Sequence, residues 1–189
     1  MTPLRLGMRA AGASLSLTLQ AQAADKPSFV ADGKVVACID PTFPPLEYME
    51  NTEAKLPVGF DVDMLNGLAE EWGVKTELVL LEFSGLLPAL EAKRCDIMAS
   101  GAVMNEERMK KFGGTPYMNT GYIILGRGDT EDTFESYEDF GGKKVAVQAG
   151  SLLEKVLDKA NAKLEEAGKE IITIQPYPKA TDVIQQVLI

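Results

Sequence analysis

The chain has 189 residues, with 28 acidic and 19 basic side chains, a net charge of −9 and no histidine. Such an acidic chain repels nucleic acid, because nucleic-acid binding depends on neutralising phosphates with lysine and arginine. The lack of histidine excludes Ser-His and Cys-His catalysis and histidine-ligated zinc or haem. No stretch has the spacing of a P-loop or a calcium loop, so we expect no cofactor and no metal site.

Residues 1–23 contain the three parts of a secretory signal peptide in the right order. Arg5 and Arg9 form a basic start, 10–19 is modestly apolar, and Ala21-Gln22-Ala23 is a small-x-small cleavage site. A disordered tail is the alternative interpretation, but the order of the parts favours export with cleavage before Ala24 and a periplasmic protein. Cleavage would remove two arginines and no acid, which changes the net charge from −9 to −11. No other segment approaches the length of a membrane span.

Strand and helix signals alternate in the next part of the chain. The expected strands are 34–40, 75–81 and 96–100. The expected helix N-caps are Asp61, Ser84 and Asn105, and the third helix is expected to end at Gly113-Gly114. This alternation predicts an α/β fold with a parallel sheet covered by helices on both faces. Ligands of such sheets bind outside the carboxyl ends of the strands, which places 40–43, Phe83 and 100–108 around one crevice.

A second α/β series follows an extended run at 117–126. Its expected elements are a strand at 143–148, a helix opened by a capping box at Ser151–Glu154, a strand at 170–175 and a helix from Thr181. We therefore expect a first lobe at 24–118, a hinge crossing at 119–126 and a second lobe at 127–189. The last helix is still in register at Ile189, so we expect the chain to be truncated and the second lobe incomplete.

The two cysteines, Cys38 and Cys95, each fall in a predicted buried strand. A disulfide of an exported protein and two buried thiols are both open interpretations, and we prefer the thiols. If both strands end at one sheet edge, the cysteines are staggered by about 10 Å at roughly 3.3 Å per residue. That separation is too large for a bridge.

Each residue of the predicted crevice also has an ordinary structural explanation. Arg108 could be a solvated surface residue, Ser100-Gly101 a strand end, Phe43 a loop anchor and Asp40 a turn cap. Their combination at one sheet edge favours a site for a small anion, because free backbone N–H groups and a guanidinium suit a carboxylate.

Seven short motifs, in order, resemble the family 3 extracellular solute-binding proteins, the polar amino-acid receptors of ABC importers. These motifs are Asp40-x-x-Phe43-x-Pro45, Gly59-Phe60-Asp61-Val62-Asp63, Leu87-Pro88-Ala89-Leu90, Asp96-Ile97-x-Ala99-Ser100-Gly101, Glu107-Arg108, Pro116-Tyr117 and Gly142–Ser151. The resemblance extends from about Lys34 to Ile189 and implies a two-lobed periplasmic-binding-protein (clamshell) fold with parallel-type sheets flanked by helices. The lobes of this fold close on a ligand about a hinge.

The resemblance also implies roles for individual residues. Arg108 matches the arginine that clamps the ligand α-carboxylate, and Ser100 and Gly101 match the segment beside the ligand's head group. Phe43 and Phe83 match aromatic positions around the ligand side chain.

In the second lobe, Ser151 and Leu152 match a helix N-terminus that offers N–H groups to the carboxylate. In the first lobe, Asp40 matches a position that can meet a basic side chain. Val103 stands where the family usually has a hydroxyl, and Leu152 where it often has threonine. The family's acidic partner for the ligand ammonium, and the returning C-terminal segment that completes its first lobe, would follow residue 189. A carboxylate ligand without an α-ammonium is therefore a second option.

The function expected from this resemblance is a monomeric, exported receptor, not an enzyme, that passes a small amino-acid-like carboxylate to an ABC permease in the inner membrane. Two alternatives stay open: a periplasmic enzyme on the same scaffold, similar to cyclohexadienyl dehydratase, and the ligand-sensing domain of a membrane receptor.

Overall fold

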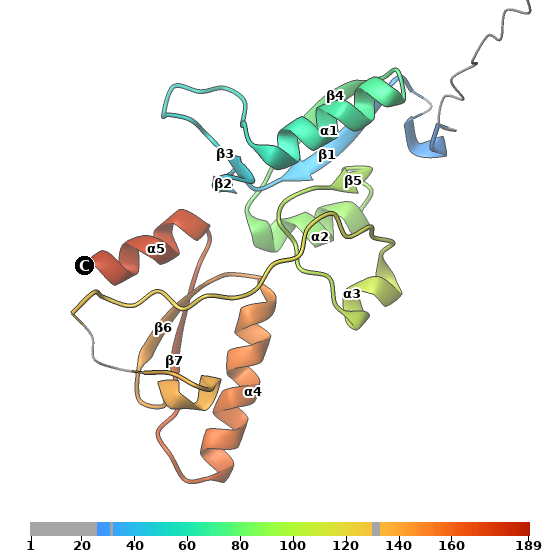
Figure 1. Cartoon of the computed structure of the whole chain (residues 1–189). Coiled ribbons are helices and arrows are strands. Elements are labelled where there is room, and N and C mark those ends of the chain that lie inside the picture. The colour runs from blue at the N-terminus through green and yellow to red at the C-terminus, as the bar shows by residue number, and fades with distance from the viewer. Residues whose placement is uncertain (1–25, 31, 130–132) are drawn as a thin grey trace, which may run out of the picture.

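The computed structural model describes residues 26–30, 32–129 and 133–189, and the expected signal peptide lies outside them. The strands are β1 (Lys34–Ile39), β2 (Thr42–Phe43), β3 (Glu47–Tyr48), β4 (Lys75–Leu80), β5 (Ile97–Met98), β6 (Lys144–Gln148) and β7 (Thr173–Tyr177). The α-helices are α1 (Phe60–Glu71), α2 (Phe83–Glu91), α3 (Glu106–Lys111), α4 (Leu152–Glu166) and α5 (Ala180–Leu188), with 3₁₀ turns at Ser28–Val30 and Tyr137–Phe140 (Figure 1).

The first lobe is built on a parallel sheet with strand order β4-β1-β5. Successive residues of a strand point to opposite faces, and β1 uses this alternation to build two cores. Ala37 and Ile39 pack with α1, whereas Cys38 packs with α2. The prediction of a parallel sheet covered by helices on both faces is confirmed.

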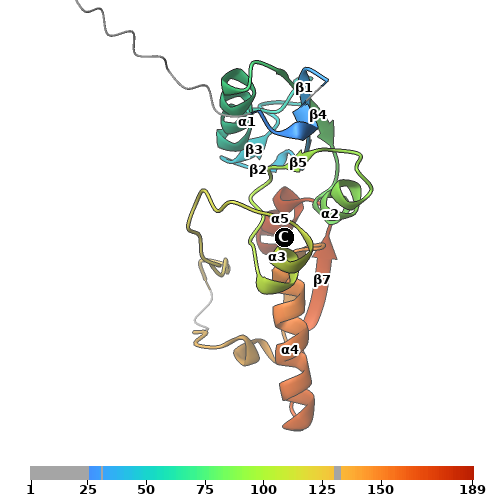
Figure 2. The same ribbon diagram turned by 90° about the vertical axis from the view of Figure 1, so that its right-hand side faces the viewer.

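The second lobe has its own parallel pair, β6 and β7, and its own core. Leu157, Ala160 and Leu164 lie at helical spacing on α4 and pack against Val147 and Ile172. α4 extends away from the first lobe in both views, while α5 lies beside β2 of the first lobe (Figures 1 and 2). The chain is therefore a two-lobed α/β fold; the exact lobe boundaries stay a prediction.

Several predicted helix starts are wrong by one or two residues. α1 begins at Phe60 after Gly59, so Asp61 lies inside its first turn and is not the cap. Glycine is required at 59 because φ is +124° and a Cβ would lie 2.4 Å from the Leu46 carbonyl oxygen. α2 begins at Phe83, which places Ser84 inside the helix as well.

The later caps follow the prediction in part. Asn105 caps α3 by accepting the Arg108 N–H at 2.8 Å, as predicted, but the helix ends at Lys111 rather than at Gly113. Ser151 is the N-cap of α4, yet its hydroxyl makes no capping bond, and the Glu154 carboxylate accepts the N–H of Gly150 instead. The capping box predicted at 151–154 is therefore wrong.

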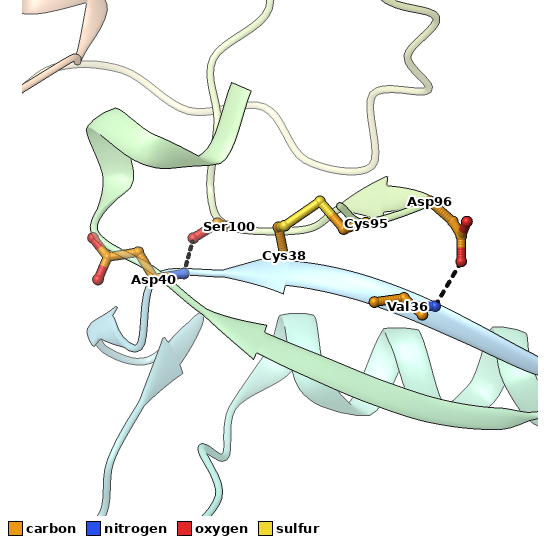
Figure 3. Close-up of a disulfide and its surroundings, with 6 residues drawn as sticks. All are labelled: Val36, Cys38, Asp40, Cys95, Asp96 and Ser100. Carbon is orange, nitrogen blue, oxygen red and sulfur yellow. Dashed lines mark hydrogen bonds between the residues drawn. A yellow bond between two sulfur atoms is a disulfide. The ribbon is translucent and has the colours of Figure 1, made fainter. Parts of the chain in front are cut away.

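The cysteine prediction is also wrong, because Cys38 and Cys95 form a disulfide with Cα atoms 5.7 Å apart (Figure 3). The predicted stagger assumed that Cys95 lies in a strand. β5 begins only at Ile97 and pairs Met98 with Cys38. Before it, Asp96 is anchored to Val36 through both its N–H and its carboxylate, each at 2.8 Å. Cys95 therefore lies over the α2 face of β1, directly above Cys38.

The segment 117–126 has neither helix nor strand and leads from the first lobe toward the second (Figure 1). Its apolar side chains are exposed, with Ile123 at 79% of its full accessibility. Within the described ranges, no helix is long and apolar enough to cross a membrane.

Candidate functional site

The candidate site lies where the carboxyl ends of β1 and β6 face each other across the lobe junction. Asp40 follows β1, and its carboxylate accepts a hydrogen bond of 2.7 Å from the amide of Gln148, the last residue of β6. Arg108 donates to the carbonyl oxygen of Gly150 at 3.2 Å, and Lys155 forms an ion pair with Glu107 at 2.7 Å. These contacts between lobes describe a closed arrangement.

Arg108 is held in place by the first turn of α3. Its N–H is fixed by Asn105, and its guanidinium donates to the carbonyl oxygens of Val103 at 2.7 Å and Gly150 at 3.2 Å. Burial lowers the pKa of this guanidinium, and none of the ion pairs formed by described residues includes it. A guanidinium has five N–H donors, so three donors remain for an anion.

A cavity of about 260 Å³ joins this guanidinium to the N-terminus of α4. Arg108, Gly150, Ser151 and Leu152 line it, together with residues of α2 and α3. The Ser151 hydroxyl is buried without a hydrogen-bond partner in the described structure. A guanidinium with donors left over, an unpartnered hydroxyl and the first N–H groups of a helix together suit a small carboxylate.

Ser100 and Gly101 lie beside Asp40, and neither is among the residues that line the cavity at Arg108. The Ser100 hydroxyl accepts the N–H of Asp40 at 2.9 Å (Figure 3) and donates to Glu47 at 3.0 Å. The N–H of Gly101 donates to the carboxylate of Asp61 at 2.9 Å. The segment that the sequence placed beside the ligand is therefore fixed from behind by two buried acids.

The two phenylalanines of the prediction lie near this segment and near Asp40. Phe43 is 45% exposed, and its ring lies so close to Gly101 that an added Cβ there would be 3.1 Å from it. Phe83 is partly buried against the core around Cys38, and its N–H bonds to the Asp40 carboxylate. The structure thus brings both phenylalanines near Asp40 and Ser100.

Glu47 and Asp61 are buried acids that the sequence analysis did not place at the site. They are 1% and 0% exposed, and Glu47 Oε2 and Asp61 Oδ1 have no partner if both groups are ionised. Burial, and next the charge of Asp61, raise the pKa of Glu47 to about 9. A protonated Glu47 can donate to Asp61 and satisfy both oxygens. Asp61 also accepts from Tyr117 at 2.9 Å, so this pair connects Gly101 to the residue just before the crossing segment 119–126.

A signal for Asp61 was present in the sequence, but none was present for Glu47. Asp61, Leu65 and Ala69 follow one another at intervals of four, so Asp61 shares the buried face of α1. Glu47 lies in a two-residue strand beside Tyr48, where no periodic pattern can indicate burial.

We expect Glu47→Gln to remove a pH dependence of stability. The folded-state pKa of Glu47 lies near 9 and its unfolded value near 4.5. The wild type therefore loses stability as pH rises from 4.5 to 9, by up to about 1.4 kcal/mol per pH unit. Glutamine retains a donor for Asp61 and an acceptor for Ser100 without titrating. In urea denaturation at pH 5, 7 and 9, the free energy of unfolding of the variant should rise relative to that of the wild type at each increase in pH.

The matched control is Glu70→Gln, an exposed glutamate of α1. Its stability profile should follow that of the wild type. Parallel profiles for wild type and Glu47→Gln would show that Glu47 is ionised in the folded protein.

Comparison with known proteins agrees with this architecture. The sequence profile of the bacterial extracellular solute-binding proteins, family 3, matches residues 35–175. The L-arginine-binding protein of Pseudomonas aeruginosa is 33% identical over 156 residues, covering 82% of this chain and 58% of that protein. The L-cystine-binding protein TcyJ of Escherichia coli is 32% identical over 126 residues, covering 66% of this chain and 47% of that protein. The chain thus spans about half the length of these relatives.

Solved structures of similar fold include an ancestral amino acid-binding protein, AncCDT-1, described as a precursor of cyclohexadienyl dehydratase. It has a TM-score of 0.72 and 30% identity, over 85% of this chain and 67% of that one. The arginine-bound truncated form of ArgBP from T. maritima has a TM-score of 0.69 and 30% identity, over 85% of this chain and 71% of that one. With the profile match across most of the described residues, this chain belongs to the bacterial extracellular solute-binding proteins, family 3.

Proposed function

We propose that this chain is an exported solute-binding receptor that captures a small, amino-acid-like carboxylate between its lobes for an ABC importer. The observation that supports this most strongly is the cavity beside α4. There, the half-buried guanidinium of Arg108, which has no ion pair among the described residues, lies next to the unpartnered hydroxyl of Ser151. Both lobes contribute to this cavity, as a site that is completed by closure requires.

The proposed ligand pose spans the lobe junction. Its carboxylate meets Arg108, Ser151 and the N–H of Leu152, and its side chain extends toward Asp40 and the rings of Phe43 and Phe83. Relatives with names that specify arginine and cystine support an amino acid as ligand. Val103 offers its carbonyl oxygen to Arg108 rather than a hydroxyl to a ligand, so a carboxylate without an α-ammonium remains the second option.

The proposed mechanism is closure about the crossing segment 119–126, with the first lobe at 24–118 and the second at 127–189. A ligand stabilises the closed state because it contacts both lobes at once. The liganded form is then the one proposed to engage a permease in the inner membrane, with the receptor acting as a monomer.

An enzyme of the dehydratase type is the second candidate, because one similar structure is described as a precursor of such an enzyme. A dehydratase needs an acid or base in contact with its substrate. The acid with the most strongly raised pKa, Glu47, is 1% exposed and lies behind Ser100, out of reach of a ligand in the cavity. This placement argues against Glu47 as that acid or base.

The experiment that tests the proposal is calorimetric titration with the proteinogenic L-amino acids and with the amine that each gives on loss of its carboxyl group. We expect saturable one-site binding of at least one amino acid and at least a hundredfold weaker binding of the matching amine. Equal binding of an amino acid and its amine would contradict carboxylate capture, and binding of neither would contradict an amino acid as the ligand. Turnover of a bound prephenate-like acid would instead favour the enzyme.

A further inference from the structure

Gln148 joins the two halves of the site in the described structure. It ends β6, and its amide donates to the Asp40 carboxylate across 108 residues of sequence at 2.7 Å. Two residues later, the carbonyl of Gly150 accepts from Arg108. One short turn of the second lobe therefore contacts both the proposed carboxylate end and the proposed side-chain end of the ligand site.

Asp40 is a buried acid whose partners are neutral. It is 2% exposed, and its carboxylate is hydrogen-bonded by the Gln148 amide, the Thr42 hydroxyl and the Phe83 N–H. The titratable side chains that interact with it electrostatically, Glu82 and Glu47, are acids as well, and none of the ion pairs between described residues includes Asp40. Buried carboxylates are normally paired with a cation, so the place beside Asp40 suits a cationic group but is occupied by an amide.

We propose that Gln148 is a specificity-determining residue, whose amide competes with cationic ligand side chains for the Asp40 carboxylate. A ligand with a positively charged side chain must displace the amide to reach Asp40. A ligand with a neutral side chain leaves the hydrogen bond in place. Gln148 therefore narrows the preference for cationic over neutral ligands; this inference rests on the proposed function.

The size of the effect follows from the bond that must be broken. Hydrogen bonds to a charged group are strong enough that losing one changes an equilibrium about tenfold to a hundredfold. In Gln148→Leu the ligand-free protein keeps a buried Asp40 without its amide partner. A guanidinium can then bind the Asp40 carboxylate without displacing an amide. L-arginine should therefore bind the variant at least about tenfold more tightly than it binds the wild type. The affinity for L-glutamine, which is of similar length but neutral, should change by less than about threefold.

The test is calorimetric titration of the 189-residue chain and its variants with L-arginine and L-glutamine. Gln175→Leu is the matched control, because Gln175 is a half-buried glutamine of the neighbouring strand β7 with no hydrogen bond to Asp40. It should leave the ratio of arginine to glutamine affinity unchanged. Gln148→Ala provides a second variant if leucine prevents folding, and Asp40→Asn combined with Gln148→Leu should abolish the gain for arginine.

The outcomes separate this inference from the proposed function. A selective gain for arginine in Gln148→Leu, lost when Asp40 is also replaced, supports it. Unchanged or equally changed affinities for the two ligands would overturn the role of Gln148 while leaving the receptor function intact. If neither variant nor wild type bound any amino acid, both would fail.

Discussion

Replacing both Cys38 and Cys95 with alanine is expected to lower the free energy of unfolding by about 4 kcal/mol. The two residues are separated by 57 positions, and constraining a loop of that length in the unfolded chain stabilises the fold by about this amount. Both side chains are buried with Leu86 and Ala89, so the bond also fixes α2 against β1. Urea denaturation at fixed pH, with and without a reducing agent, measures the effect.

The reducing agent supplies the control for this prediction. It should destabilise the wild type by about as much as the double replacement does, and it should leave the double variant unchanged. Equal unfolding midpoints for oxidised wild type and double variant would mean that the disulfide does not form in the native protein.

Arg108→Ala should reduce ligand affinity by about 30-fold to several thousandfold. Deleting one partner of a desolvated, hydrogen-bonded charge pair costs about 2–5 kcal/mol. The variant also removes the donor to the carbonyl oxygens of Val103 and Gly150, which loosens the contact between the lobes. The measurement is titration with the amino acid that the wild type binds best.

Two further variants show whether the guanidinium itself is required. Arg108→Lys retains the positive charge without the planar fork of donors and should recover only part of the affinity. Arg94→Ala removes an exposed arginine beyond the end of α2 and should bind as the wild type does. An unchanged affinity in Arg108→Ala would place the carboxylate elsewhere.

Local sequence patterns predict the fold well where helix and strand spacing decides it. The β4-β1-β5 sheet and the apolar face of α4 depend on such spacing, and both are confirmed. The cap at Asn105 is confirmed because a side chain that accepts a hydrogen bond from a residue three positions later is a local interaction.

The features that were missed depend on contacts between distant segments. Cys95 reaches Cys38 only because β5 is two residues long and the chain before it crosses the face of the sheet. Glu47 accepts a hydrogen bond from Ser100, 53 positions away, and Gln148 meets Asp40 only when the lobes are in contact. Their positions therefore cannot follow from local periodicity.

A crystal structure of the protein with its bound amino acid tests the central proposal most directly. We predict that the ligand carboxylate lies within hydrogen-bonding distance of the Arg108 guanidinium and of the N-terminus of α4, with residues of both lobes in contact. A ligand bound to one lobe alone, or bound away from Arg108, would contradict capture by closure around this residue.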